Sequence, residues 1–213
     1  MVRWVLVVDL RKCIGCNTCT VACKIENFTP KDVFWIKVLK GEKDGKRISI
    51  PMQCMHCKTP SCLKVCPVEA ITRRDDGIVI IDQTRCIGCK NCIAACPYGA
   101  PQFLDKIEPY FPIGFTPWEA YGLKNNQRIF HNIGIVEKCT FCYHRIDEGL
   151  RRGLKPGVDR EATPVCVNLC PTSARYFGDL EDPNSEVSRL LATRKFFRIR
   201  EELQTEPSIY YLT

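Results

Sequence analysis

The chain has 213 residues, enough for one or two modest domains with real cores, and 16 of them are cysteine. Its formal net charge is +7, but the lysine and arginine residues are scattered without a long basic run, which disfavours nucleic-acid binding. No apolar run approaches the length of a membrane span or of a signal-peptide core, so we expect the chain to be soluble by itself.

The first predicted element is a strand over WVLVV (residues 4–8), which stops at Asp9 and enters a cysteine-rich loop. The loop KCIGCNTCTVACK (12–24) has the spacing C-x2-C-x2-C-x3-C, and its cysteines form group one: Cys13, Cys16, Cys19 and Cys23. We expect the fourth cysteine of such a loop to stand at the start of a helix. Lys24 occupies the position where the other groups have proline, so this helix can extend as far as Thr29-Pro30.

Two β-hairpins are predicted next, on either side of the second cysteine group. Residues 34–50, FWIKVLKGEKDGKRISI, predict a hairpin that turns at Lys43-Asp44-Gly45. The segment IPMQCMHCKTPSCLKVCP (50–67) then supplies group two: Cys54, Cys57, Cys62 and Cys66. A turn at Asp76-Gly77 precedes the strand IVIID, so a second hairpin leads the chain into the third group.

The third group repeats the first. VVDLRKCIGCNTC (7–19) aligns without a gap with IIDQTRCIGCKNC (80–92), which indicates an internal repeat. Group three lies in RCIGCKNCIAACP (85–97): Cys86, Cys89, Cys92 and Cys96. Group four is split between KCTFC (138–142) and PVCVNLCP (164–171): Cys139, Cys142, Cys166 and Cys170.

Three other segments complete the chain. Residues 105–133 are rich in aromatic residues and proline, and they form either a surface loop packed on its own aromatics or a docking surface, with a helix starting at Thr116-Pro117. SEVSRLLATRKFF (185–197) predicts a short amphipathic helix capped near Asn184-Ser185. The tail PSIYYL (207–212) is expected to be extended.

The cysteine spacing favours iron–sulfur clusters over zinc or disulfides. Three cysteines at i, i+3 and i+6 can hold three corners of a cubane, and Gly15 and Gly88 allow the backbone to approach inorganic sulfide closely. Group four alone also fits a zinc site, but the compact triples of groups one and three exceed the needs of one tetrahedral ion. All 16 cysteines fall into four groups of four, which predicts four 4Fe–4S clusters. Their charge of about −8 would offset the basic chain.

Histidine and basic residues near the cysteines have less specific roles. His56 lies inside C-M-H-C, but the cysteines already suffice, so His56, His131 and His144 are expected in supporting or surface positions rather than as ligands. Five basic residues flank the cysteines and either raise cluster potentials or are simply solvated: Lys12, Lys58, Arg85, Lys90 and Lys138. We find no nucleophile–base pair and no free cluster corner, which favours electron transfer over catalysis in this chain.

Four motifs together resemble the four-cluster iron–sulfur subunits of complex molybdopterin oxidoreductases, of the polysulfide, thiosulfate, tetrathionate, dimethyl sulfoxide and arsenate reductase kind. These motifs are CIGCNTCTVACKIEN, QCMHCKTPSCLKVCPVEAI with RCIGCKNCIAACPYGAP, KCTFCYHRIDEG followed by PVCVNLCPTSARYFGDL, and the ending TEPSIYYL. The gap from Cys142 to Cys166 is longer than in many members. Some relatives replace one cysteine of the third group by tryptophan, whereas this chain has Cys89 there, so four full cubanes are implied.

The resemblance implies an α+β fold of two bacterial-ferredoxin-like units related by a pseudo-two-fold axis, the inner unit inserted in the outer one, with long loops. The implied outer unit comprises residues 1–49 and 134–180, and the inner unit comprises residues 50–104. Residues 105–133 form a connecting insertion, and residues 181–213 form a C-terminal helix and extended tail.

The resemblance also implies which cysteines hold each cluster, with the fourth ligand exchanged between groups. We name these ligand sets sites 1 to 4. Site 1 comprises Cys13, Cys16, Cys19 and Cys170, and site 2 comprises Cys139, Cys142, Cys166 and Cys23. Site 3 comprises Cys54, Cys57, Cys62 and Cys96, and site 4 comprises Cys86, Cys89, Cys92 and Cys66.

The implied function is electron transfer without catalysis in this chain itself. A large catalytic subunit with a molybdenum or tungsten pterin centre is expected near site 1, and a separate quinone-reactive membrane subunit, where present, near the inner unit. The chain would be soluble or peripheral at the cytoplasmic membrane, with cytoplasmic and exported locations both open. Alternatives are a polyferredoxin subunit of a hydrogenase, formate-linked or multihaem cytochrome complex, a zinc-stapled scaffold, and a catalytic cluster enzyme.

Overall fold

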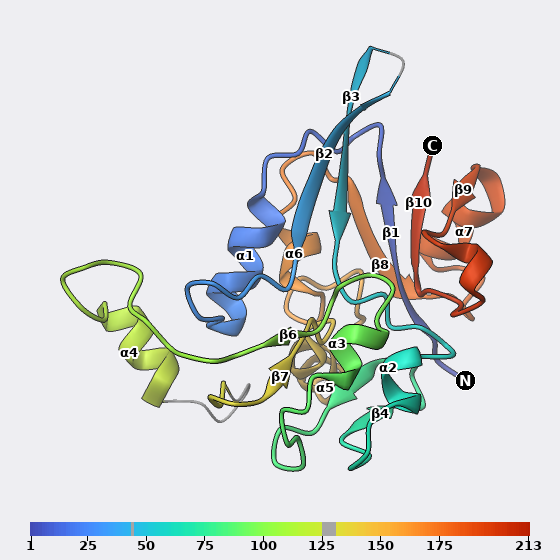
Figure 1. The fold of residues 1–213 in the computed structure, drawn as a ribbon. Coiled ribbons are helices and arrows are strands. Elements are labelled where there is room, and N and C mark those ends of the chain that lie inside the picture. The colour runs from blue at the N-terminus through green and yellow to red at the C-terminus, as the bar shows by residue number, and fades with distance from the viewer. Residues whose placement is uncertain (44, 125–130) are drawn as a thin grey trace.

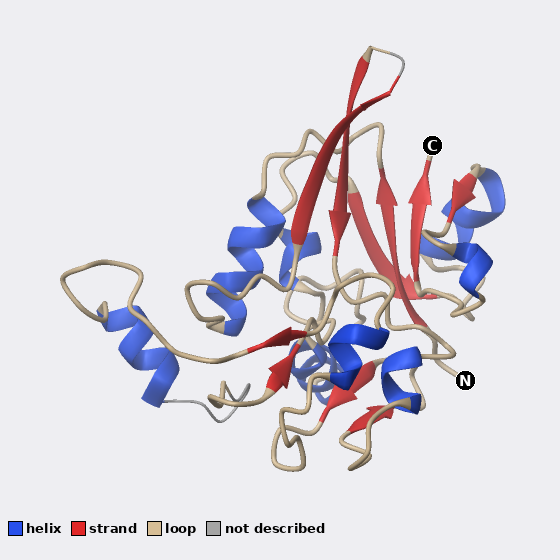
Figure 2. Ribbon diagram, viewed as in Figure 1, coloured by secondary structure: helices blue, strands red, loops and turns tan. Residues whose placement is uncertain are grey.

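The computed structural model describes residues 1–43, 45–124 and 131–213 (Figure 1). Short helices and strands alternate along the chain and are joined by long loops (Figure 2). The protein is therefore a small mixed α/β chain in which loops carry much of the structure. Among the described residues, no helix is long and apolar enough to cross a membrane.

The largest sheet joins the two ends of the chain. It has the strand order β8-β1-β10-β9, formed by Arg175–Asp179, Trp4–Asp9, Ile209–Leu212 and Phe196–Phe197. Strand β1 runs antiparallel to β8 and parallel to β10, so the expected N-terminal strand and extended tail are confirmed and lie side by side.

Strand β1 is buried on both faces, which explains its continuous apolar sequence. Leu6 and Val8 point into the main core, whereas Val5 and Val7 pack with Val187 of helix α7 (Glu186–Thr193). This division follows the two-residue period of a strand. The predicted cap of α7 is confirmed, since the Ser185 side chain accepts a hydrogen bond from the backbone N–H of Ser188.

The described residues also form three two-stranded sheets. Strands β2 (Lys37–Lys43) and β3 (Lys46–Met52) form the predicted hairpin, which projects from the body of the molecule (Figure 1); Asp44 in its turn lies outside the described residues. Strands β4 (Ile71–Arg73) and β5 (Val79–Ile81) form the second predicted hairpin. Strand β6 (Gln102–Phe103) pairs with β7 (Val136–Glu137) and links the third cysteine group to the fourth.

Each cysteine group carries a short helix at or just before its fourth cysteine. In chain order these are α1 (Thr18–Asn27), α2 (Ser61–Lys64), α3 (Asn91–Ala95) and α6 (Val165–Asn168). Group four carries a further helix, α5 (Tyr143–Arg151), which begins directly after Cys142. The prediction that the fourth cysteine starts a helix is wrong, because three of the fourth cysteines follow their helices and Cys23 lies inside α1. Three of these helices end before the fourth cysteine because a proline follows that cysteine, and proline disfavours helical geometry at the residue before it.

Helix α1 is the longest of the four because no proline follows its fourth cysteine. It continues through Lys24 and ends at Asn27, and Phe28 closes it with a left-handed φ of 50°. The expected extension of this helix is therefore confirmed, with its end two residues before Thr29-Pro30.

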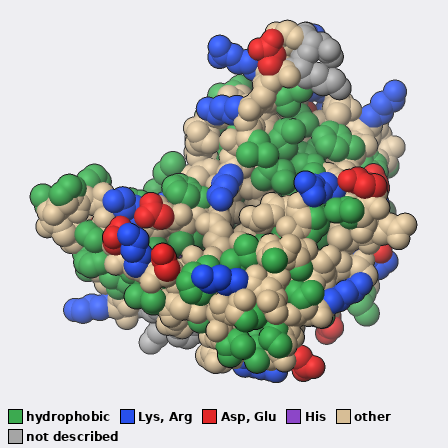
Figure 3. All heavy atoms as spheres, viewed as in Figure 1, with side chains coloured by type: hydrophobic (Ala, Val, Ile, Leu, Met, Phe, Trp, Pro, Cys, Tyr) green, Lys and Arg blue, Asp and Glu red, His purple; other side chains and the backbone are tan. Residues whose placement is uncertain are grey.

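The insertion after β6 forms an arm that carries helix α4 (Pro117–Lys124) and stands apart from the main body (Figure 1). Its predicted start is confirmed, since the Thr116 hydroxyl accepts from the backbone N–H of Glu119. Trp118 stacks on Phe28 with ring centroids 5.1 Å apart, which attaches the arm to the end of α1. The face in Figure 3 shows lysine and arginine side chains scattered singly among acidic and apolar ones.

Candidate iron–sulfur sites

The two repeated Cys-Ile-Gly-Cys loops need their glycines for steric reasons. Gly15 and Gly88 share a φ of +68°, which lies in the left-handed region. A Cβ on Gly15 would stand 2.3 Å from Ser49 Oγ, and a Cβ on Gly88 would stand 2.0 Å from the carbonyl oxygen of Gly134. The sequence predicted a close approach here, and the close neighbours in the structure are other segments of the chain.

The fourth cysteines share a local hydrogen bond. The backbone N–H of Ala70 donates to Cys66 Sγ at 3.3 Å, and the N–H of Ala174 donates to Cys170 Sγ at the same distance. Burial raises the pKa of Cys96, while the backbone N–H of Ala100 acts to lower it. A backbone donor four residues beyond the fourth cysteine thus faces the sulfur of that cysteine in three groups.

Two cavities are each lined by four cysteines. One is lined by Cys54, Cys57, Cys62 and Cys96. The other is lined by Cys66, Cys86, Cys89 and Cys92. Each cavity combines three cysteines of one group with the fourth cysteine of the other, and four cysteines around one cavity fit the ligand demand of a 4Fe–4S cluster.

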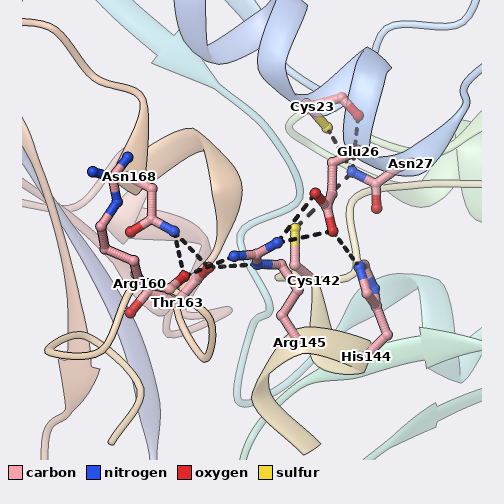
Figure 4. Close-up of polar contacts among 9 residues, drawn as sticks. All are labelled: Cys23, Glu26, Asn27, Cys142, His144, Arg145, Arg160, Thr163 and Asn168. Atoms are coloured by element: carbon pink, nitrogen blue, oxygen red, sulfur yellow. Dashed lines mark hydrogen bonds and ion pairs between the residues drawn. The ribbon is translucent and has the colours of Figure 1, made fainter. Parts of the chain in front are cut away.

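The cysteines of site 2 are all buried. Burial raises the pKa of the Cys23 thiol, and the thiolates of Cys139, Cys142 and Cys166 raise it further. The amide nitrogen of Asn27 lies 3.4 Å from Cys23 Sγ and 4.0 Å from Cys142 Sγ, so one amide contacts two of the four sulfurs (Figure 4). Cys23 is therefore surrounded by cysteines more than a hundred residues away in sequence.

The long connection between Cys142 and Cys166 is fixed to helix α1 through Arg145 (Figure 4). The Arg145 guanidinium contacts the Glu26 carboxylate at 3.2 Å and donates from Nε to the carbonyl oxygen of Thr163 at 2.8 Å. His144 also contacts Glu26, at 3.0 Å. The additional residues in this gap are thus tied to the element that carries Cys23.

Site 1 combines buried and exposed cysteines. Burial is the main cause of the raised pKa of Cys19. The charge of Arg175 acts to lower this pKa, and the thiolates of Cys166 and Cys13 act to raise it. Cys16 is exposed, and its hydrogen bond to the Thr18 hydroxyl lowers its pKa. Helix α1 packs on α6, and Cys170 follows α6 by two residues.

Among the described residues, no three His, Cys, Asp or Glu side chains are grouped as a site for one metal ion. A cubane holds its four thiolates on the corners of an iron–sulfide cube, farther apart than thiolates on one tetrahedral ion.

The histidines and flanking basic residues divide into buried and exposed classes. His56 is buried and its ring centroid lies 3.8 Å from that of Phe141, so the surface position considered for it is wrong, and its supporting role stays a prediction. Lys138 is also buried, lines the site 3 cavity and donates to the carbonyl oxygen of Cys139 at 3.2 Å. The other four basic residues are exposed: Lys12, Lys58, Arg85 and Lys90.

Sequence reasoning missed two buried cations beside the cysteines. Lys24 Nζ donates to the carbonyl oxygens of Pro30 and Val33 at 2.8 and 2.7 Å and lies 4.3 Å from the centroid of the Phe34 ring. Its burial lowers its pKa to about 8. The only sequence signal was the missing proline at position 24. Arg175, on β8, contacts Cys166 and carried no local signal.

Four-cysteine cavities in a small α/β scaffold, with a short helix at each fourth cysteine, define an iron–sulfur protein with ferredoxin-like domains. Three family models, each described as a 4Fe-4S dicluster domain, match residues 46–109, 12–70 and 78–148. The protein therefore carries 4Fe–4S clusters, and its 16 cysteines are consistent with four.

Relatives along the full chain specify the family. The sequence is 38% identical to a selenate reductase subunit of Mesobacillus selenatarsenatis, over 100% of this chain and 72% of that protein. It is 34% identical to a tetrathionate reductase subunit of Salmonella typhimurium, over 99% of this chain and 72% of that protein. It is also 34% identical to the arsenate respiratory reductase iron-sulfur subunit of a Shewanella species, over 97% of this chain and 94% of that protein. The protein belongs to this family of iron–sulfur electron-transfer subunits of molybdopterin reductases.

Proposed function

We propose that this chain forms a linear path of four 4Fe–4S clusters, held at sites 1 to 4, inside a molybdopterin reductase complex. The observation that carries the proposal is the continuity of the cysteine sets between two exposed ends, Cys16 at site 1 and Cys89 at site 4. The clusters, when bound, supply reversible one-electron transfer, and the chain supplies their ligands, spacing and shielding from water.

The ligand exchange is supported separately for sites 2, 3 and 4. Three cysteines of group four, Cys139, Cys142 and Cys166, have the largest cysteine effects on the pKa of Cys23. Sites 3 and 4 each coincide with one four-cysteine cavity. For site 1, the proximity of Cys13 to Cys19 and the packing of α1 on α6 support the assignment.

The order of the sites is supported by contacts between neighbouring sets. Cys19 of site 1 interacts electrostatically with Cys166 of site 2, and Cys139 of site 2 interacts with Cys54 of site 3. Cys62 of site 3 packs in one apolar cluster with cysteines of site 4. Each set thus adjoins the next, as a path for electrons requires.

The two-unit architecture is part of the same proposal. Strand β1 before group one pairs antiparallel with β8 after group four, just as β5 before group three pairs antiparallel with β4 after group two. This equivalence supports a pseudo-two-fold relation between two ferredoxin-like units. The outer unit would comprise residues 1–49 and 134–180, and the inserted inner unit residues 50–104, with the insertion 105–133 and the tail 181–213 added to them.

The exposed ends indicate where partners would bind. Cys16 lies beside the projecting β2–β3 hairpin, near exposed Ile14 and Leu39, so we place the large molybdenum or tungsten subunit there. Cys89 with exposed Ile87 marks the opposite end, where a quinone-reactive membrane subunit would accept or deliver electrons. The chain would then be peripheral at the membrane through that subunit.

Purification of the native complex, with metal analysis, tests the function. We expect about 16 iron atoms per chain, together with a large subunit that contains molybdenum or tungsten and a pterin. A nickel–iron subunit or a multihaem cytochrome in place of the pterin subunit would overturn the assignment to this class of complex. About four zinc and no iron per chain would overturn electron transfer itself.

A further inference from the structure

The three Cys-Pro motifs of the chain allow one nearby position to be compared among the cysteine groups. The fifth residue after the fourth cysteine is Ile71 in group two, Pro101 in group three and Arg175 in group four. Arg175 is 4% exposed and opens strand β8, where it pairs with Val8 of β1. Because two other copies build the same turn with an apolar residue, the turn does not require arginine.

The contacts of Arg175 point to the cluster ligands. Its Nη2 donates to the side-chain oxygen of Gln53 and lies 3.5 Å from Cys166 Sγ. Its Nε and Nη1 are buried, and neither has a hydrogen-bond partner among the described residues. A buried cation is costly unless anions pair with it, and the anions that surround this guanidinium are thiolates.

The charge of Arg175 acts on cysteines of two sites. Its charge lowers the pKa of Cys19, a ligand of site 1, and of Cys23, a ligand of site 2, against the dominant effect of burial. Burial acts to lower the pKa of Arg175, but the thiolates of Cys166 and Cys19 raise it. The guanidinium therefore interacts with both cysteine sets at once.

Gln53 extends this arrangement to a further sulfur. A guanidinium has only donors, so the amide oxygen of Gln53 must face Arg175, which directs the amide NH2 the other way. That nitrogen lies 3.9 Å from Cys139 Sγ, another ligand of site 2. Arg175 thus fixes the positive end of the Gln53 dipole against the same cluster site.

We propose that Arg175, together with the Gln53 amide that it orients, raises the reduction potentials of the clusters at sites 1 and 2. The inference rests on the proposed ligand sets. Reduction adds one electron to a cluster that is already anionic, so a fixed cation beside its thiolates stabilises the reduced form. Arg175 acts through its charge and its orientation of Gln53, and it is a positioning residue rather than a ligand.

An EPR-monitored redox titration of the complete, cluster-loaded chain tests the proposal, with dithionite as reductant. In Arg175→Gln we expect the equilibrium constant for reduction at site 2 to fall at least about tenfold, which corresponds to ~59 mV for one electron. Site 1 should shift in the same direction, and sites 3 and 4 should not. Arg175→Lys, which retains the charge, should recover most of the potential, and this recovery separates electrostatics from packing.

Arg189→Gln is the matched control, because it makes the same chemical change on the exposed face of α7 and solvent screens that charge. If Arg175→Gln does not assemble, Gln53→Glu carries the test, since a carboxylate against the guanidinium would neutralise it and lower the same potentials. Unchanged potentials at sites 1 and 2 in a fully loaded variant, or an equal shift at all four sites, would overturn the inference. Failure of the chain to bind four clusters is a different result, which would overturn the proposed ligand sets.

Discussion

The crossed position of Cys23 is the most direct test of the ligand sets, and Cys23→Ser is the change that makes it. Cys23 lies four residues after Cys19 on the same helix, yet its sulfur shares the amide of Asn27 with Cys142 Sγ, at 3.4 and 4.0 Å. We therefore expect Cys23→Ser to disable the cluster of site 2. The loss would be about four of about 16 iron atoms, with the remaining clusters retained.

EPR spectra of paired variants measure this outcome. The spectrum of Cys23→Ser should match that of Cys142→Ser, which removes another ligand of site 2. The matched control is Cys19→Ser, on the same helix, which should match Cys13→Ser of site 1. If Cys23→Ser instead reproduced the Cys13→Ser spectrum, the first group would hold its own cluster and the exchange of ligands would be refuted.

Three further predictions concern residues that support the sites. Lys24→Met should lower the free energy of unfolding by about 3 kcal/mol, because it leaves buried carbonyls without a charged donor; the urea midpoint for loss of cluster absorbance measures this. Gly88→Ala should destabilise more than Gly15→Ala in the same assay, because the two share a φ of +68° but only Gly88 faces a backbone carbonyl. His131 donates a hydrogen bond to Glu137, and its pKa is raised although burial opposes the shift. Because a raised pKa in the folded protein stabilises it only while the ring is protonated, thermal stability should decline as pH rises above about 6.5. The variant His131→Gln should remove that decline.

Controls separate these effects from general damage. Lys64→Met removes an exposed lysine at the end of α2 and should leave the urea midpoint unchanged; an equal loss in both lysine variants would contradict the role of Lys24. Adding Ser49→Gly to Gly15→Ala should recover stability, since it removes the clashing side chain. For His131, both ring nitrogens contact acceptors, Glu137 and the carbonyl oxygen of Asn27, as a protonated ring requires. A pH profile shared by wild type and His131→Gln would show that another group titrates.

Local sequence patterns predicted much of the fold correctly. The two hairpins follow from turn residues between apolar runs, and the starts of α4 and α7 follow from Thr116-Pro117 and Ser185. The length of α1 follows from a single substitution, lysine for proline at position 24. Each of these features depends on residues within one turn or one helix.

Features that depend on distant residues could not be predicted in the same way. Gln53 and Arg175 meet although they are 122 positions apart, and the motifs that contain them did not indicate this contact. Helix placement relative to the fourth cysteine was wrong because the restriction that proline imposes on its predecessor outweighed the ligand geometry assumed for the loop. The burial of His56 arises from packing on Phe141, which comes from another cysteine group.

The repeated cysteine motif gives the proposed sites similar ligands but not similar surroundings. Buried Arg175 adjoins sites 1 and 2, and buried Lys138 lines the cavity of site 3, whereas the basic residues near Cys16 and Cys89 are exposed lysines. A charge in a low-dielectric interior acts much more strongly than the same charge in solvent. Differences in potential along the path would therefore come mainly from buried cations such as Arg175 and Lys138 and little from the exposed lysines. The residues that distinguish the four copies thus lie outside the cysteine motif that makes them recognisable.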